Sequence, residues 1–225
     1  MEEGSRPHRF EDLSLADFVD RLASAEPVPG GGSASAVAGA LGAALVTMVA
    51  SLSIGKAKYA SHAELHETAV QTGRTLAERF LRIADRDADA FAAFAAARKM
   101  PRESEPELEA RRRAMRDAAR WAAEVPFECV EACVDLAGIA EALAGRSNVN
   151  ASSDVAVAAN LAEAAARGAA ANVVINLPSV DDEGFAGSLI RRVKDHVDEV
   201  ERLAALARQA ALSGDPRPPL PASGK

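Results

Sequence analysis

Aromatic side chains and excess positive charge are both scarce in this sequence. Phe, Trp and Tyr together make up 4% of the 225 residues, and the formal net charge is -7. General nucleic-acid binding depends on a basic surface, and single-strand binding also uses aromatic side chains that stack on bases. The composition therefore predicts a protein without a nucleic-acid partner.

Cysteines are few, and nothing resembles a secretion signal. Two cysteines, Cys129 and Cys133, are too few for a disulfide scaffold, so we expect reduced thiols. The first residues, "MEEGSRPHRFEDLSL", are polar and include acids, unlike the apolar core of a secretory signal. Both observations favour a cytoplasmic protein.

Strand patterns are almost absent. The stretch "NVVINL" is the only strand candidate, and one strand has nothing to pair with. Elsewhere apolar residues recur at helical spacing, from a helix capped by Ser14 to a last helix over about 183–212, with Pro126 expected to break or kink the path. The sequence predicts one all-α domain over residues 1–212, a multi-helix bundle around a long Ala/Gly-rich central helix. A disordered Pro-rich tail is expected over 213–225.

The longest uncharged segment, Pro27–Gly55, has three possible interpretations. It is long enough to span a bilayer, but it consists mainly of Ala, Gly and Ser, which insert less favourably than Leu or Phe. A phosphate-binding loop would need Gly-Lys-Ser/Thr, or a strand before its glycines, and the sequence has neither. The favoured interpretation is a buried helix, capped by Ser33 and running to about residue 54, with no membrane partner.

Both ends of this expected helix carry candidate binding groups. The stretch "PGGGS" places three glycines at the helix start, where free backbone N–H groups favour an anion or a flat polar ligand. Lys56 and Lys58 follow the other end, where cations also complement the helix dipole without any ligand. The pattern alone leaves both explanations of the lysines open.

Several polar residues lie where an apolar side chain would be expected. Asp87 falls on the apolar stripe of a predicted helix, so its carboxylate is either satisfied by partners or functional. The loop "SNVNASSD" supplies Asn148, Asn150 and Asp154, and helix capping explains only part of this group. Asn176 lies beside an apolar segment and needs hydrogen-bond partners.

His62 and His66 are spaced so that both can face one side of a helix. Two such histidines can bind a metal, but zinc sites need a third ligand, and none is recognisable nearby. We therefore predict a solvated helix start and no metal site.

Six short motifs, in order, make the chain resemble the cyclodeaminase domain of formiminotransferase-cyclodeaminase and its stand-alone relative, methenyltetrahydrofolate cyclohydrolase. The resemblance runs from about Phe18 to about Leu206. Ser147 stands where the family usually has Gly, and Ser53 where Thr is common; both departures are mild. The motifs are "PGGGS", "MVASLSIGKAKY", "DADAF" followed by "MP", "VPF", "SNVNASSD" and "NVVINL".

The resemblance implies an all-helical homodimer that binds a tetrahydrofolate derivative in a cleft next to the glycine loop, with no tightly bound cofactor. It implies ring closure of formiminotetrahydrofolate to methenyltetrahydrofolate with loss of ammonia. The alternatives are addition of water to methenyltetrahydrofolate, giving formyltetrahydrofolate, or folate binding without catalysis.

The resemblance also suggests roles for the candidate residues. A carboxylate would transfer the proton or hold the pterin ring, lysines would hold the glutamyl tail, and asparagines would orient polar ring atoms. The catalytic candidates are Asp87, Asp154 and Lys56, and the substrate-binding candidates are Gly30, Gly31, Gly32, Ser33, Lys58, Asn148, Asn150 and Asn176.

Overall fold

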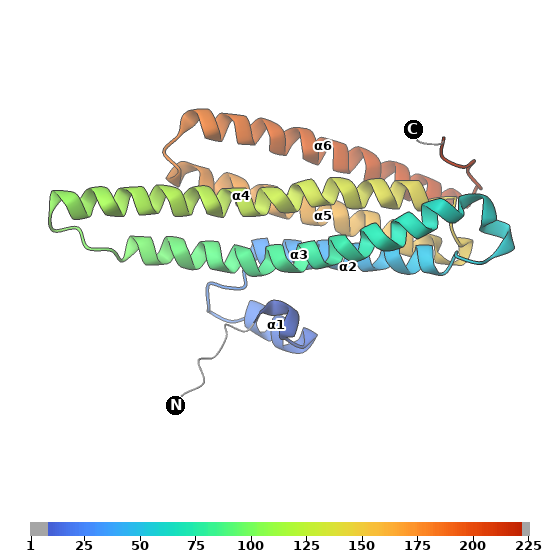
Figure 1. The fold of residues 1–225 in the computed structure, drawn as a ribbon, viewed down its shortest axis with the longest axis horizontal. Helices are drawn as coiled ribbons and strands as arrows, with labels where there is room; N and C mark the ends of the chain where they lie inside the picture. Colours follow the sequence, from blue (N-terminus) through green and yellow to red (C-terminus); the bar gives the residue numbers. More distant parts are fainter. Residues whose placement is uncertain (1–8, 222–225) are drawn as a thin grey trace.

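The computed structural model describes residues 9–221, and this part of the chain contains helices and no strand. Figure 1 shows the long helices lying side by side, with the short first helix outside the bundle. The α-helices are α1 (Leu15–Leu22), α2 (Gly31–Ser51), α3 (Ala63–Arg98), α4 (Glu105–Leu143), α5 (Ser152–Asn176) and α6 (Glu183–Ser213). Short 3-10 turns are η1 (Phe10–Asp12), η2 (Ala57–His62), η3 (Val149–Ala151) and η4 (Leu177–Ser179). The predicted all-α fold class is confirmed.

Three helices, α2, α4 and α5, each contact at least three other long helices. Helix α4 contacts each of the other four long helices, and α2 contacts α3, α4 and α5. The buried faces of α4 and α5 consist mainly of Ala, Val and Leu. This small-residue core lets the helix axes approach closely, as the sequence predicts for the Ala/Gly-rich segment.

Glycines on α2 set the spacing to its neighbours. A Cβ atom added at Gly39 would lie 2.6 Å from the Phe80 ring of α3, and one at Gly42 would lie 2.9 Å from Leu136 of α4. Both separations are shorter than real Cβ contacts, so the glycines make room for large side chains on α3 and α4. Gly138, inside α4, has no other atom within 4 Å of its added Cβ.

Gly39→Ala is expected to destabilise the protein by about 1–3 kcal/mol, because the new methyl group overpacks the Phe80 ring. The control Gly138→Ala is expected to stabilise it by about 0.5–1 kcal/mol, because Ala is favoured over Gly inside a helix and the site is open. Urea unfolding followed by circular dichroism measures both changes. Equal stabilisation by the two variants would contradict the close packing at Gly39.

Helix α4 continues through Pro126, so the proline does not break the helix as one of the two predicted outcomes required. Proline has no backbone N–H, so the carbonyl four residues earlier, that of Ala122, loses its helical donor. The Asn176 side chain of α5 replaces it, because its Nδ2 donates to the Ala122 oxygen at 2.8 Å. A side-chain donor therefore satisfies the carbonyl that the proline leaves free.

Two helix boundaries differ from the predicted ones. Helix α2 begins at Gly31 with Gly30 as its N-cap, so the prediction that Ser33 is the cap was wrong. The strand candidate "NVVINL" instead forms the last turns of α5 and the start of η4. The predicted cap at Ser14 is confirmed, because its Oγ accepts a hydrogen bond from the Asp17 backbone N–H.

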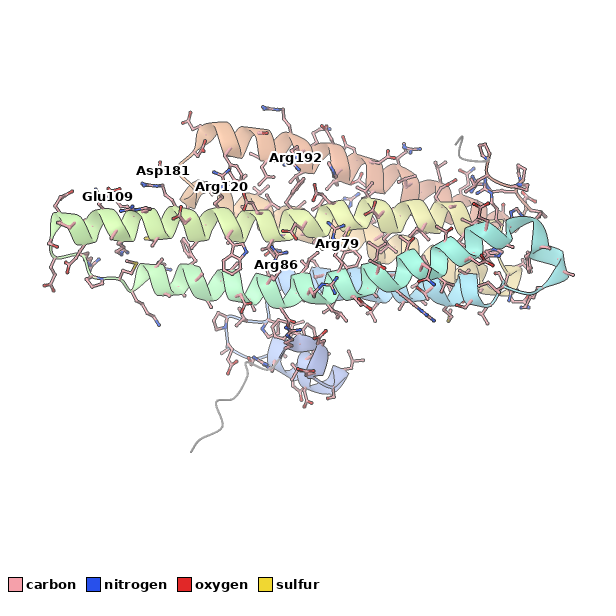
Figure 2. The ribbon with its side chains drawn as sticks, viewed as in Figure 1. Arg79, Arg86, Glu109, Arg120, Asp181 and Arg192 are labelled. Atoms are coloured by element: carbon pink, nitrogen blue, oxygen red, sulfur yellow. The ribbon has the colours of Figure 1, made fainter. Side chains whose placement is uncertain are left out.

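Ion pairs from arginines lie along the contact surfaces of α4. Figure 2 labels Arg79 and Arg86, which reach from α3 toward α4. Both Nη atoms of Arg86 donate to the Glu128 carboxylate, at 2.5 and 2.9 Å. Arg79 lies 3.6 Å from Asp135. Half-exposed pairs of this kind contribute little stability, about 0–1 kcal/mol each, so they mainly fix how α3 and α4 are aligned.

The Pro-rich tail, for which the composition predicts disorder, contacts the end of α4. Arg217 donates its backbone N–H to the Gly145 carbonyl at 2.9 Å, and its Nη2 pairs with Glu141 at 2.5 Å. Arg146 donates in turn to the Pro218 carbonyl at 2.7 Å. These bonds link residues 217–218 to the α4–α5 connection.

Among the described residues, α2 alone is long and apolar enough to cross a membrane, with a mean hydropathy of 1.8. Half of its most apolar window is buried inside the bundle. A helix in the core of a bundle meets the same length and hydropathy criteria as a membrane span. Helix α2 packs against α3, α4 and α5, as a core helix does.

Candidate functional site

The first candidate group lies where α2 begins, against the C-terminal half of α3. Ser33 is completely buried, and its Oγ donates to the Asp87 carboxylate at 2.9 Å and to the Ala84 carbonyl at 3.2 Å. We call Gly30, Gly31, Gly32, Ser33 and Asp87 the glycine-end cluster. The structure therefore joins two motifs that are 54 residues apart in the sequence.

The environment of Asp87 favours its protonated form. Burial raises the pKa of the Asp87 carboxyl above its ordinary value, and the hydroxyl and backbone amide of Ser33 offset part of this rise. Such a carboxyl group can hold a proton closer to neutral pH than an exposed aspartate can. Asp87 is therefore suited to transfer a proton in either direction.

The glycines allow side chains of the protein itself to approach the start of α2. A Cβ atom on Gly32 would lie 2.2 Å from Oδ1 of Asp87, so any other residue there would displace the carboxylate. A Cβ atom on Gly31 would meet the amide nitrogen of Asn172 at 3.4 Å. The separation at Gly31 is an ordinary contact, so only Asp87 requires the close approach, at Gly32. From the sequence, the close approach was attributed only to a ligand.

Asn176 lies one turn beyond Asn172 on α5, and its amide already has partners. Its Nδ2 donates to the carbonyls of Ala122 and Asn172, both at 2.8 Å. Both hydrogens of this amide are therefore used inside the fold. Only the Oδ1 atom of Asn176 would be available to accept a hydrogen bond from a ligand.

The second candidate group lies at the opposite end of α2. Here the Ser53 Oγ accepts the Asn148 backbone N–H at 2.8 Å, and the Tyr59 hydroxyl accepts that of Val149 at 3.0 Å. These two bonds hold the loop before α5 against the segment after α2. Thr at position 53, common in the family, could accept the same bond.

The remaining candidates share this second location. We call Lys56, Lys58, Asn148, Asn150 and Asp154 the lysine-end cluster. Both lysines are exposed, and the Lys58 Nζ lies 5.5 Å from the centre of the Tyr59 ring. The Asn148 Oδ1 accepts the Asn150 backbone N–H at 3.2 Å, and Asp154 lies in the first turn of α5.

The structure does not bring all the predicted site residues together within one chain. Helix α2 has 21 residues, which corresponds to a length of about 30 Å. The glycine-end cluster lies at its start and the lysine-end cluster beyond its end. Asp87 and Asp154, both predicted as proton-transfer candidates, therefore lie near opposite ends of α2.

A small cavity opens at the lysine end. It has a volume of about 100 Å³ and is lined in part by Lys58, Tyr59, His62, Asn148 and Ser152. Small-molecule sites usually occupy about 300–1,000 Å³, so this cavity holds at most one arm of a folate-sized ligand. From the sequence, His62 was considered only as a metal ligand and Tyr59 was not selected, although Tyr59 is the one tyrosine of the sequence and follows the lysine pair.

The two histidines are not the solvated helix start that the sequence predicted. His66 is completely buried, and its Nε2 donates to the Arg146 carbonyl at 3.0 Å. The Nδ1 atoms of His62 and His66 are buried without a hydrogen-bond partner in the described part of the chain. Within residues 9–221, no group of three or more His, Cys, Asp and Glu side chains is placed to hold a metal ion.

The buried His66 is expected to make stability depend on pH. Burial lowers the pKa of the His66 imidazole below 6.5, so the unfolded chain gains this proton at a higher pH than the folded one does. The free energy of unfolding should therefore fall as the pH drops below about 6.5, by up to about 1.4 kcal/mol per pH unit. His66→Gln removes the titrating group but keeps a donor for the Arg146 carbonyl.

Urea unfolding at several pH values measures this effect. The difference in unfolding free energy between the original chain and His66→Gln should shrink or reverse toward acid pH. His196→Gln on α6 is the matched control and should leave the acid-dependent component in place. Parallel pH curves for the original chain and His66→Gln would show that His66 contributes none of it.

Comparisons with known proteins show which family this chain is similar to. The family described as Formiminotransferase-cyclodeaminase matches residues 14–195. A methenyltetrahydrofolate cyclohydrolase from Methylorubrum extorquens is 36% identical over 194 residues, covering 84% of this chain and 91% of the relative. The crystal structure of formiminotetrahydrofolate cyclodeaminase from Thermotoga maritima is 30% identical, with a TM-score of 0.82 over 90% of this chain and 98% of that one.

Other relatives are longer than this chain. The formimidoyltransferase-cyclodeaminase of Rattus norvegicus is 32% identical over 195 residues, which cover 87% of this chain but only 36% of the relative. The match therefore concerns one part of that protein. Since the family pattern covers most of the chain and a relative of nearly equal length is 36% identical, the chain belongs to the formiminotransferase-cyclodeaminase family.

Proposed function

We propose that the protein is a folate-dependent one-carbon enzyme, a formiminotetrahydrofolate cyclodeaminase. The observation that carries this proposal is the Asp87 carboxyl group, with a pKa raised by burial, held by Ser33 at the glycine-lined start of α2. Ring closure with loss of ammonia requires a group that moves a proton between two nitrogens. The likeness to the Thermotoga maritima cyclodeaminase supports the same reaction.

The reaction needs one proton relay. The anilinic nitrogen of the substrate attacks the carbon of the protonated formimino group, forming a carbon–nitrogen bond and a tetrahedral carbon. The Asp87 carboxylate takes the proton from the attacking nitrogen and gives it to the amino group on the same carbon. Ammonia then leaves with the electrons of its bond, and the methenyl cation keeps the positive charge. The carboxyl group returns to its initial state.

The other candidates would position the substrate. The exposed ammonium groups of Lys56 and Lys58 suit the carboxylates of the glutamyl tail. Asn148 and Asn150 would face polar atoms of the same ligand. The reaction would need no tightly bound cofactor. We propose a homodimer acting in the cytoplasm, without nucleic-acid or membrane partners.

A second candidate function is methenyltetrahydrofolate cyclohydrolase. It is favoured by the Methylorubrum extorquens relative, which matches over 91% of its length. In that reaction a water oxygen bonds to the methenyl carbon and a base removes one proton of the water. The remaining hydroxyl proton passes to a ring nitrogen as the bond between that nitrogen and the carbon breaks, and the C–O bond becomes the formyl carbonyl of formyltetrahydrofolate. Asp87 in its ionised form would be the base.

One experiment separates these functions. Purified protein receives formiminotetrahydrofolate or methenyltetrahydrofolate in separate reactions, and the methenyl absorbance is followed. A rise with the first substrate, above the rate without protein, supports the cyclodeaminase. Faster loss with the second alone supports the cyclohydrolase. No acceleration of either reaction would refute both and leave folate binding without catalysis.

A further inference from the structure

The segment that follows α6 is held at the end of α4 by one side chain. Figure 1 shows this segment in dark red at the end of the bundle where α6 ends. Among residues 214–221, Arg217 alone is partly buried, and the others are exposed. We call residues 214–218 the strap, and Arg217 is its anchor.

Arg217 supplies hydrogen-bond donors to the last turn of α4. The final carbonyls of a helix have no donor within the helix, and a positive charge is favoured at this end. The Nη1 atom of Arg217 donates to the Glu141 carbonyl at 2.9 Å and to the Ala144 carbonyl at 3.3 Å. Its Nη2 atom donates to the Glu141 carboxylate at 2.5 Å, and this pair is less exposed than the ion pairs within α6.

The strap also bonds to the loop that leaves α4. The backbone N–H of Arg217 donates to the Gly145 carbonyl at 2.9 Å, and Nε of Arg146 donates to the Pro218 carbonyl at 2.7 Å. Gly145 has a φ of +72°, and a Cβ atom added there would lie 2.7 Å from the Asp215 carbonyl oxygen. Both the left-handed backbone and the close approach require glycine. The start of the loop is therefore shaped to accept the strap.

The same loop carries two of the candidate substrate-binding residues. Asn148 and Asn150 follow Arg146 by two and four positions. Arg146 is 5% exposed, and its carbonyl accepts the bond from Nε2 of His66 on α3. Arg146 is thus held by α3 through its backbone and by the strap through its side chain. Releasing the strap loosens the start of the loop.

The strap also forms part of the wall of the small cavity at the lysine end. Gly214 and Pro216 line this cavity together with Tyr59, His62 and Asn148. Without the strap, the cavity would be open to solvent on that side. His62 keeps a buried Nδ1 atom without a partner in the described part of the chain, and such an atom favours a ligand that supplies one.

We propose that the strap is a positioning element of the substrate site, with Arg217 as a positioning residue. The strap holds the loop that carries Asn148 and Asn150 in the arrangement that binds substrate, and it closes the adjoining cavity. The loop takes no part in the proton relay of Asp87, so the strap acts on binding and leaves the chemical step unchanged. The proposal rests on the proposed folate activity.

Arg217→Ala should raise KM about tenfold and leave kcat within about twofold, because the loosened loop must be ordered again when substrate binds. The Kd for tetrahydrofolate, measured by titration calorimetry, should rise by a similar factor. Arg217→Lys keeps a cation beside Glu141 but lacks the fork that reaches two carbonyls, so its KM should lie in between. Leu220→Ala is the matched control, an exposed residue beyond the strap, and it should change neither constant.

Two shortened chains separate the strap from the rest of the tail. A chain that ends after Ser213 should reproduce Arg217→Ala, whereas one that ends after Pro219 keeps the strap and should bind as the original does. Amide hydrogen exchange supplies a measurement that does not depend on activity. In Arg217→Ala, residues 145–150 should exchange faster, while the first half of α4 should exchange as before.

The outcomes separate this inference from the proposed function. If the original protein binds tetrahydrofolate but catalyses neither reaction, the proposed function fails, and the comparison of Kd values still tests the strap. An unchanged Kd in Arg217→Ala overturns the inference, even with faster exchange, because the strap would then hold the loop without serving the substrate. A lower kcat with an unchanged KM would also overturn it. A protein that does not bind tetrahydrofolate would overturn both.

Discussion

Replacing Asp87 by asparagine should lower the turnover of ring closure about 100- to 10,000-fold, the usual contribution of a proton-transfer group. The asparagine oxygen can still accept the Ser33 hydrogen bond, so the fold should persist. Its amide cannot carry the proton from the attacking nitrogen to the departing ammonia. Steady-state kinetics with formiminotetrahydrofolate measures the loss, and circular dichroism checks the fold.

Asp89→Asn is the matched control, because Asp89 is an exposed residue on the same helix. It should retain turnover close to that of the original protein. Full turnover by Asp87→Asn would remove Asp87 from the proton-transfer role. Equal losses in both variants would point to a general effect of charge on α3.

Removing the Ser33 hydroxyl tests the direction in which the pKa of Asp87 moves. Because the hydroxyl lowers the pKa of the Asp87 carboxyl, Ser33→Ala should raise this pKa further above its ordinary value. The carboxylate would then form only at higher pH, so the acid limb of the kcat/KM profile should move to higher pH. A merely structural role of Ser33 would lower the rate without moving this limb.

Phe80→Ala is expected to cost about 3–5 kcal/mol of unfolding free energy, the typical cost of removing a buried Phe ring. The Phe80 ring is completely buried against the face of α2 that contains Gly39. Its removal leaves a cavity that the surrounding alanines cannot fill. Urea unfolding measures the cost as a lower midpoint with an unchanged slope.

Phe91, on the same helix, provides the matched control because it is 43% exposed. Phe91→Ala should cost under about 1 kcal/mol, as surface substitutions usually do. Similar costs at the two positions would mean that the α2–α3 contact is looser than the close approach at Gly39 indicates.

The helices could be predicted from the sequence because their signals are local. Apolar spacing and caps such as Ser14 indicate where a helix runs. The predicted break at Pro126 was wrong because the effect of this proline on α4 depends on a hydrogen-bond donor from α5, far along the sequence. The predicted cap at Ser33 was wrong because its hydroxyl donates to Asp87 on α3 instead of capping α2.

The site was predictable as a set of residues but not as an arrangement. Motif resemblance selected Asp87, the glycines, the lysines and the asparagines, yet sequence order does not show which of them meet. The antiparallel packing of α2 against α3 brings Asp87 to Gly32, and it leaves Asp154 at the other end. His66 was misjudged because burial depends on the chain packed over a residue, which helical spacing alone does not show.

The bond between Asn176 and the Ala122 carbonyl implies an evolutionary constraint on two distant positions. Losing Asn176 while Pro126 remains would leave a carbonyl without its donor, at a cost of about 1–3 kcal/mol. If Pro126 were replaced by alanine first, its new N–H would take over the carbonyl, and Asn176 would become easier to lose. Relatives that lack the proline should therefore vary freely at position 176, whereas those that keep it should keep an amide there.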